Sequence, residues 1–220
     1  MPNRIRTNSN AEKRLSESLE PILASDSDMP VAFDLGGVLL RGGLLTANDE
    51  VVVFDELSTS FGIGSEDALR VWKELQPLSE VGKIPESFVW ESIAALRKGV
   101  NADDVRSLLL SEVCPIHEGV NALTFLKSKS RVVMLATNQF ISWTEEWRRR
   151  YGWFQYFDHV VCSEAIGSRK PAPEFFREVF SAAGERPCWF IDDRPENALA
   201  AGRCGLRPIW AASPINWVYL

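Results

Sequence analysis

The sequence predicts an α/β fold with a doubly wound parallel sheet and an inserted α-helical subdomain. Short, continuously apolar runs rich in β-prone residues alternate with segments of helical periodicity. Runs of this kind are typical of parallel strands that are covered on both faces. A long stretch after the first run, residues 44–114, contains helical patterns and no clear strand. These observations together predict a core sheet interrupted once by a helical insert.

Four apolar runs are the predicted strands of the core, and a fifth run is a further candidate. Helical patterns follow at 118–129, 172–183 and 195–204, the last with Pro195 in its first turn and Gly205 just beyond its end. This alternation implies parallel strands joined by right-handed crossovers. The predicted strands are residues 31–33, 132–135, 160–162 and 189–191, with 207–210 as the candidate.

The insert divides into amphipathic segments separated by glycines, over 51–61, 65–81, 85–97 and 102–113. Residues 51–54 also have the composition of a strand, so that alternative remains open. We therefore expect an N-terminal tail (1–28), an α/β core (29–43 and 115–220) and a helical insert (44–114).

The composition is that of a soluble globular protein. Of the 220 residues 45% are hydrophobic and 25% charged, which excludes wholesale disorder and a small disulfide scaffold. The net charge of −6 disfavours broad binding to nucleic acid or to an anionic membrane, although a local basic pocket remains open. No apolar run approaches the ~20 residues that span a bilayer. We expect neither nucleic acid nor membrane as a partner, and the oligomeric state stays undetermined.

The expected compartment is the cytoplasm. The four cysteines form no C-x-x-C pair and fit reduced thiols better than disulfides or a metal site. The first residues contain the Arg and Ser of an organellar transit peptide, but also Glu12, Glu17 and Glu20. A flexible tail or a short helix is therefore the preferred interpretation of residues 1–28.

Polar residues gather where the predicted strands end. Because the carboxyl ends of parallel strands meet at one edge of a sheet, residues far apart in sequence converge there. Three carboxylates in one crevice repel each other unless a cation neutralises them, and oxygen ligands without His or Cys select Mg²⁺. Thr, Asn and Lys donate to phosphate oxygens, so the set predicts metal-assisted phosphoryl transfer. The residues are Asp34, Thr137, Asn138, Lys170, Asp192 and Asp193.

Four short motifs in order carry a family resemblance that extends over about 31–210. They are Val31 to Leu39 (VAFDLGGVL), Met134 to Asn138 (MLATN), Lys170-Pro171, and Phe190 to Asn197 (FIDDRPEN). With them the chain resembles the haloacid dehalogenase-like (HAD) hydrolases, a superfamily of Rossmann-like core that consists mostly of phosphatases. The insert is similar to the helical cap of that superfamily. Its segment 82–85 (GKIP) resembles a subgroup that includes sugar-phosphate phosphatases and the N-terminal domain of soluble epoxide hydrolases.

The resemblance implies a role for each motif residue in hydrolysis of a small phosphorylated metabolite, such as a sugar phosphate. Asp34 would attack phosphorus and form an aspartyl-phosphate. Thr137 and the Asn138 backbone would hold phosphoryl oxygens. Lys170 would neutralise charge on Asp34 and on the phosphoryl group.

The resemblance also implies a magnesium site. Its ligands would be Asp34, the backbone carbonyl of Gly36, and Asp193, with Asp192 as a direct or supporting group. Asn197 would orient a metal-bound water or a neighbouring ligand, although a surface helix Asn is the alternative.

Gly36 departs from the common pattern. Most phosphatases of this superfamily have a second Asp at this position, which protonates the leaving group and later activates water. A positioned acid or base contributes about 10²–10⁴-fold to a rate. A subgroup resembling glucose-1-phosphate phosphatases also has Gly here, so the chain remains a predicted enzyme. Two alternatives stay open: a binding homologue with little or no catalysis, and a metal-independent 2-haloacid dehalogenase.

Some residues near the motifs have two interpretations at this stage. Three arginines either face the substrate or form ordinary surface contacts, and three aromatic residues of the insert either line the substrate pocket or belong to the core. The arginines are Arg41, Arg169 and Arg194, and the aromatic residues are Trp72, Phe88 and Trp90.

Overall fold

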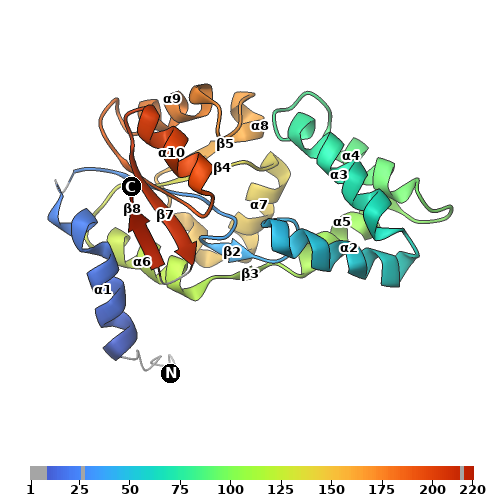
Figure 1. The fold of residues 1–220 in the computed structure, drawn as a ribbon, viewed down its shortest axis with the longest axis horizontal. Helices are drawn as coiled ribbons and strands as arrows, with labels where there is room; N and C mark the ends of the chain where they lie inside the picture. The colour runs from blue at the N-terminus through green and yellow to red at the C-terminus, as the bar shows by residue number, and fades with distance from the viewer. Residues whose placement is uncertain (1–8, 26–27, 214–215) are drawn as a thin grey trace.

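The computed structural model describes residues 9–25, 28–213 and 216–220 (Figure 1). In this part of the chain the main sheet has six strands, of which five are parallel and the last, β8, is antiparallel to β7. The predicted α/β fold is therefore confirmed. In sheet order the strands are β5 (His159–Cys162), β4 (Val133–Thr137), β1 (Val31–Phe33), β6 (Trp189–Asp192), β7 (Arg207–Ser213) and β8 (Asn216–Tyr219).

The central strand β1 explains why the strand sequences are continuously apolar. Successive side chains of a strand point to opposite faces. Val31 and Phe33 enter one hydrophobic cluster and Ala32 enters another, and all three are fully buried. Since helices cover both faces, neither face of β1 requires polar residues.

Helices lie on both sides of the sheet (Figure 1). Helices α9 (Pro173–Ala182) and α10 (Pro195–Arg203) lie on one side, where the Phe176 ring packs edge-on against Phe190 of β6. On the other side lie α1 (Ser9–Ala24) and α6 (His117–Ser128). The remaining core helices are α7 (Ile141–Arg150), the 3₁₀ helix η1 (Gly152–Tyr156) and α8 (Ser163–Ile166).

The insert consists of helices and is bounded by a small antiparallel pair of strands, β2 (Leu40–Arg41) and β3 (Cys114–Pro115). Residues 51–54 lie inside a helix, so the strand alternative is wrong. Thr46 caps this helix through its side chain, and Gly62 ends it at a φ of 68°. The insert helices are α2 (Ala47–Phe61), α3 (Ser65–Ser79), α4 (Glu86–Ala94) and α5 (Ala102–Ser111).

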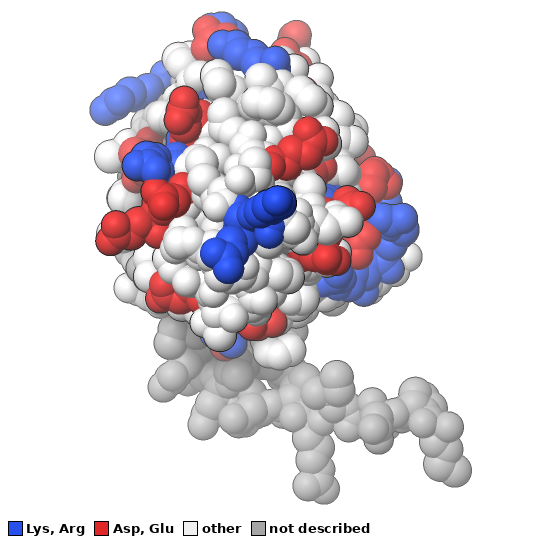
Figure 2. Space-filling view, turned by 90° about the vertical axis from the view of Figure 1, so that its right-hand side faces the viewer, with Lys and Arg blue, Asp and Glu red and all other residues white. Residues whose placement is uncertain are grey.

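On the face of the molecule at the insert end, acidic and basic side chains are interspersed (Figure 2). The charge there is not of one sign, as a surface that attracts nucleic acid by its field would need. None of the described helices is long and apolar enough to cross a membrane. The exact division of the chain at 28, 44 and 114 stays a prediction.

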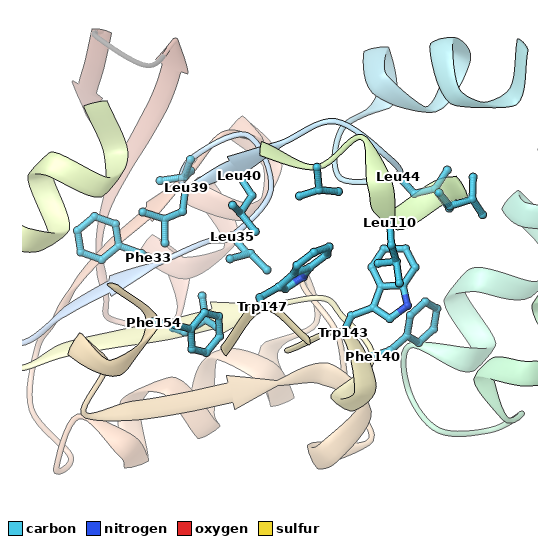
Figure 3. Packing of buried hydrophobic residues seen from close by; sticks show 14 of the residues in the cluster. Phe33, Leu35, Leu39, Leu40, Leu44, Leu110, Phe140, Trp143, Trp147 and Phe154 are labelled. Carbon is cyan, nitrogen blue, oxygen red and sulfur yellow. The ribbon is translucent and has the colours of Figure 1, made fainter. Parts of the chain in front are cut away.

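A continuous apolar cluster joins the insert to the core. It runs from Phe33 in the sheet through Trp143 of α7 to Leu110 of α5 (Figure 3). The Trp90 ring of α4 is stacked between Trp72 of α3 and Trp143, with centroid distances of 5.7 Å on both sides. Buried aromatic pairs of this kind contribute about 0.5–1.5 kcal/mol beyond their burial. The stack therefore holds α3 and α4 against α7.

Glu86, at the start of α4, strengthens the contact between the insert and α7 through hydrogen bonds. Its carboxylate accepts from the indole nitrogens of Trp90 and Trp143, each at 2.8 Å, and from the Ser142 hydroxyl. Arg106 of α5 donates to it at 2.7 Å. Burial alone would raise the pKa of Glu86, but the hydrogen bonds from Ser142, Arg106 and Trp90 lower it below its usual value. This network fixes the insert over the carboxyl edge of the sheet.

Three short strands of the structure were not predicted from the sequence. β2 and β3 have two residues each, too few to show a pattern, and β8 has four. The N-terminal region shows a helix in its described part, α1, whose Leu19 and Ile22 are fully buried. The transit-peptide alternative concerns the first 21 residues, of which 1–8 lie outside the described residues.

Arg131, just before β4, anchors the C-terminal end of α1. Its guanidinium is buried and donates to the carbonyls of Ile22 at 2.8 Å and Ser25 at 3.1 Å. These carbonyls belong to the last turn of α1 and the residue after it, where intrahelical donors run out. The buried guanidinium thus supplies hydrogen bonds to carbonyls at the C-terminal end of α1 and holds this end against the core.

Replacing Arg131 with Ala is expected to lower the free energy of unfolding by about 2–3 kcal/mol, because the buried carbonyls lose a charged donor. Urea denaturation measures this change. Arg177→Ala is the control, since its side chain is 66% exposed and forms a surface ion pair with Glu174, and about 0.5 kcal/mol or less is expected for it. Equal small losses in both variants would contradict the anchoring role.

Candidate active site

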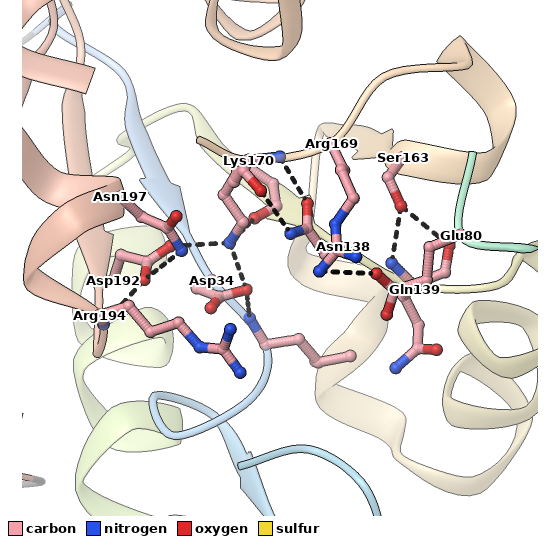
Figure 4. Close-up of polar contacts among 12 residues, drawn as sticks. Asp34, Glu80, Asn138, Gln139, Ser163, Arg169, Lys170, Asp192, Arg194 and Asn197 are labelled. Atoms are coloured by element: carbon pink, nitrogen blue, oxygen red, sulfur yellow. Dashed lines mark hydrogen bonds and ion pairs between the residues drawn. The ribbon is translucent and has the colours of Figure 1, made fainter. Parts of the chain in front are cut away.

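The predicted site residues converge at the carboxyl ends of three neighbouring strands (Figure 4). Asp34 directly follows β1, Thr137 ends β4 and Asp192 ends β6. The register pairs Phe33 with Leu135 on one side and with Ile191 on the other, which brings these ends level. The site therefore follows from the strand order, as the sequence pattern predicts.

Lys170 lies at the centre of the site. Its ammonium nitrogen is 2.7 Å from Oδ1 of Asp34 and 2.7 Å from Oδ2 of Asp192. It also donates a hydrogen bond of 3.0 Å to the carbonyl of Ala136 in β4. An ammonium group has three donors, so all of them are used. With a side chain only 1% exposed, Lys170 connects the ends of β1, β4 and β6.

Asn138 holds the loop that carries Lys170. Its amide nitrogen donates to the Lys170 carbonyl at 3.0 Å, and its oxygen accepts from the Lys170 backbone N–H at 2.8 Å. Sequence reasoning gave Asn138 a role through its backbone and had no signal for this side-chain contact. The backbone role toward a phosphoryl group stays a prediction.

Both carboxylate oxygens of Asp192 accept hydrogen bonds from the protein. While Oδ2 faces Lys170, Oδ1 accepts from the Arg194 backbone N–H at 2.9 Å and from the Asn197 amide at 3.0 Å. Asn197 is itself buried, which excludes the surface alternative. Asp192 is therefore better suited to position Lys170 than to bind a metal directly.

Asp193 is available for a cation. One ligand oxygen each from Asp34, Asp192 and Asp193 lies within 4.8 Å of the others. Gly37 allows this approach: with a φ of 72°, it has a backbone that favours glycine, and a Cβ there would lie 2.3 Å from Oδ2 of Asp193. The Asp193 carboxylate thus occupies the space that a side chain at position 37 would need.

The electrostatics of the cluster fit a divalent cation. Burial first, and then Asp192 and Asp193, raise the pKa of Asp34 to about 8, with Lys170 opposing the shift. Burial and Asp192 also raise the pKa of Asp193 to about 6. Burial alone would lower the pKa of Lys170, but Asp192 and Asp34 raise it. Three carboxylates thus face two cations, the Lys170 ammonium and the Arg194 guanidinium, and Mg²⁺ with oxygen ligands would relieve the excess negative charge.

A cavity opens beside this cluster, between the strand ends and the insert. Of the residues left open above, Arg169, Arg194 and Trp72 line it, whereas Arg41, Phe88 and Trp90 do not. The other polar residues of the lining are Gln76, Glu80 and Gln139, which belong to no sequence motif and were not predicted. The full lining is Asp34, Gly36, Leu44, Leu45, Trp72, Gln76, Glu80, Thr137, Asn138, Gln139, Trp143, Arg169, Lys170, Arg194 and Asn197.

A comparison with protein families matches most of the chain. The model of the haloacid dehalogenase-like hydrolases matches residues 31–205. The chain belongs to this family. It is therefore a HAD-like hydrolase, as the four motifs predict.

Solved structures resemble this HAD-like hydrolase over most of its length. A HAD family enzyme from Bacteroides thetaiotaomicron superposes with a TM-score of 0.66 at 23% identity, covering 82% of this chain and 92% of that one. A structure of the same enzyme in complex with magnesium and inorganic phosphate gives 0.64 at 24% identity, covering 81% and 91%. L-2-haloacid dehalogenase from Xanthobacter autotrophicus gives 0.59 at 17% identity, covering 82% and 76%. These identities show a shared fold.

A curated relative matches a smaller part. Flavin mononucleotide hydrolase 1 of Arabidopsis thaliana, described as chloroplastic, is 45% identical over 53 residues. The match covers 23% of this chain and 22% of that protein. The cytoplasmic location expected for this HAD-like hydrolase stays a prediction.

The structure gives a physical reason for Gly36 in this HAD-like hydrolase. A Cβ at position 36 would lie 2.5 Å from the backbone carbonyl oxygen of Leu45, at the entry to the insert. A second Asp would therefore require the backbone around Leu45 to move. The group that is usual at this position does not fit the present backbone.

Lys170→Met is expected to destabilise the metal-free protein by about 3–5 kcal/mol, because two buried carboxylates lose their cation. Urea denaturation without divalent metal measures the change. Lys127→Met is the matched control, because Lys127 pairs with Asp158 at 2.6 Å with both side chains about one-third exposed, and about 1 kcal/mol or less is expected there. Similar losses in the two variants would refute the central position of Lys170.

Proposed function

We propose that this chain is a Mg²⁺-dependent phosphomonoester hydrolase that acts on a small phosphorylated metabolite through an aspartyl-phosphate at Asp34. The observation that carries the proposal is the cluster in which Lys170 contacts Asp34 and Asp192 beside a third carboxylate, Asp193. This arrangement combines a nucleophile, a fixed positive charge and a set of oxygen ligands for a metal.

In the proposed reaction the Asp34 carboxylate attacks phosphorus, and water later releases phosphate from the acyl phosphate. Lys170 offsets the negative charge that gathers on Asp34 and on the phosphoryl group. Thr137 and the Asn138 backbone hold phosphoryl oxygens at the end of β4. Asn197 supports the site by fixing Asp192, to which it donates.

The proposed metal ligands are Asp34, the backbone carbonyl of Gly36 and Asp193, with Asp192 in a supporting position. A bound Mg²⁺ would supply charge neutralisation at the phosphoryl oxygens. The raised pKa values of Asp34 and Asp193 support this assignment, because burial first and the neighbouring carboxylates second disfavour negative charge there, and a bound cation would offset both effects.

Two comparisons support the substrate class. A structural neighbour has been solved with magnesium and inorganic phosphate, and the curated relative is named a flavin mononucleotide hydrolase. We therefore propose a phosphorylated small molecule, with sugar phosphates and flavin mononucleotide as the first candidates.

Phosphate release from a panel of sugar phosphates, flavin mononucleotide and 4-nitrophenyl phosphate tests the activity. Asp34→Asn is expected to lower kcat by about 10³-fold or more, because the nucleophile is lost. Asp55→Asn, an exposed residue of α2, is the control and is expected to retain full activity. Turnover that survives in Asp34→Asn would exclude the aspartyl-phosphate route. A panel without any turnover would favour the alternative of a phospho-ligand-binding homologue.

Metal removal tests the second part of the proposal. Chelation with EDTA is expected to abolish phosphate release, and added Mg²⁺ to restore it. Asp193→Asn is expected to raise the half-saturating Mg²⁺ concentration by about 10–100-fold, because a charged ligand is lost. Halide release from a 2-haloacid in EDTA, in place of phosphatase activity, would instead support the dehalogenase alternative.

A further inference from the structure

Glycine at position 36 leaves the proposed reaction without its usual proton carrier, and a group elsewhere in the cavity is a candidate for that role. Among the described residues that line the cavity, only Asp34 and Glu80 carry carboxyl groups, and no His, Cys or Tyr is present. The arginines stay protonated, and the three donors of Lys170 are already engaged. Since Asp34 is the proposed nucleophile, Glu80 is the remaining proton carrier.

Glu80 is held with one oxygen anchored and the other without a hydrogen bond. It caps the C-terminus of α3 and is only 3% exposed. Gln76, one turn earlier, donates to Oε1 at 2.7 Å. Oε2 has no hydrogen-bond partner within the described residues, although an Arg169 nitrogen lies 3.1 Å away in an ion-pair contact (Figure 4). A buried oxygen without a hydrogen bond is costly, and a ligand in the cavity would satisfy it.

We propose that Glu80 of the insert is the catalytic acid and base that takes over the role absent at Gly36. The proposal rests on the proposed phosphatase function and names a further catalytic residue for it. Helix α3 brings Glu80 to the same cavity as Asp34, and the stack of Trp72, Trp90 and Trp143 holds that helix in place.

The proton balance of the reaction needs one such group. In the first step the Asp34 carboxylate bonds to phosphorus, and the bond from phosphorus to the leaving oxygen breaks. The electron pair stays on the leaving oxygen, which takes the proton of Glu80 and departs as an alcohol. In the second step a water oxygen bonds to phosphorus, its proton passes to Glu80, and the bond between Asp34 and phosphorus breaks. Glu80 is restored, and the products are one alcohol and one inorganic phosphate.

The surroundings of Glu80 favour the protonated form of its carboxyl group more than water does. Burial raises its pKa above the usual value, while Arg169, the hydrogen bond from Gln76, Arg194 and Lys170 lower it without cancelling the effect of burial. Its titratable and charged neighbours are Arg169, Arg194, Lys170 and, from β5, the thiol of Cys162.

The dependence on the leaving group tests the proposal. Three probes are used: 4-nitrophenyl phosphate, phenyl phosphate and the alkyl phosphate with the highest turnover in the metabolite panel. The 4-nitrophenolate ion departs readily without a proton, whereas an alkoxide does not. Glu80→Gln is expected to lower kcat by about 10²-fold or more for the alkyl phosphate and by about fivefold or less for 4-nitrophenyl phosphate, with phenyl phosphate between them. Equal losses for all three probes would overturn the proposal.

Matched variants separate proton transfer from a structural role. Glu86→Gln changes another insert carboxylate that contacts the core, and Arg169→Gln removes the ion pair while keeping the carboxyl group. Any loss in Glu86→Gln is expected to be the same for the three probes. Arg169→Gln is expected to move the alkaline limb of the pH profile to higher pH, because Arg169 lowers the pKa of Glu80. Glu80→Asp retains a carboxyl group and is expected to recover part of the alkyl phosphate turnover. Urea denaturation checks that each variant is folded, and a leaving-group dependence in Glu86→Gln equal to that of Glu80→Gln would refute the assignment.

The pH profile gives an independent measurement. With the alkyl phosphate, wild-type kcat is expected to fall on the alkaline side as Glu80 loses its proton, and Glu80→Gln is expected to lose this limb. An unchanged limb in Glu80→Gln would refute the role. If the wild type instead shows no phosphatase activity dependent on Asp34, the proposed function itself fails, which is a distinct result from equal losses in Glu80→Gln.

Discussion

The buried ammonium of Lys170 is the interaction on which the arrangement of the site depends. It joins the ends of three strands through Asp34, Asp192 and the Ala136 carbonyl. A buried ammonium group is stable only when acceptors surround it. The loop before α9 places Lys170 where the ends of three strands supply these acceptors. Asn138 fixes that loop through its side chain, and Asn197 fixes Asp192. The polar residues at the strand ends therefore form one connected network.

This network carries more negative than positive charge, and the excess negative charge is the reason that we propose a bound cation there. Asp193 lies against the bare backbone of Gly37, which leaves its carboxylate beside Asp34 rather than away from it. On the opposite wall, the Leu45 carbonyl occupies the space that a side chain at Gly36 would need. The path of the chain into the insert thus leaves no room for an Asp side chain at position 36. Helix α3 of the same insert places Glu80 in the lining of the cavity.

Much of the core could be predicted because its constraints are local. A strand buried on both faces must be apolar throughout, and the residue that follows it lies at the carboxyl edge, which made Asp34, Thr137 and Asp192 recognisable. The two-residue strands β2 and β3 left no pattern, since their pairing depends on where the insert leaves and rejoins the core. The docking of α1 depends on Arg131, whose partners are more than a hundred positions away in the chain. Contacts at such separation have no local signature.

The sequence by itself determined the fold class, the strand-end motifs and the predicted nucleophile, because the periodicity of burial and the short motifs are properties of neighbouring residues. Only the tertiary structure decided which groups face each other across the cavity. It showed that Asp192 accepts a hydrogen bond from Lys170 and that Asn197 is buried. It also showed that Glu80 contacts Gln76 and Arg169 where the insert covers the core. Those contacts arise from the packing of α3 and α4 against α7, which no stretch of the sequence specifies alone.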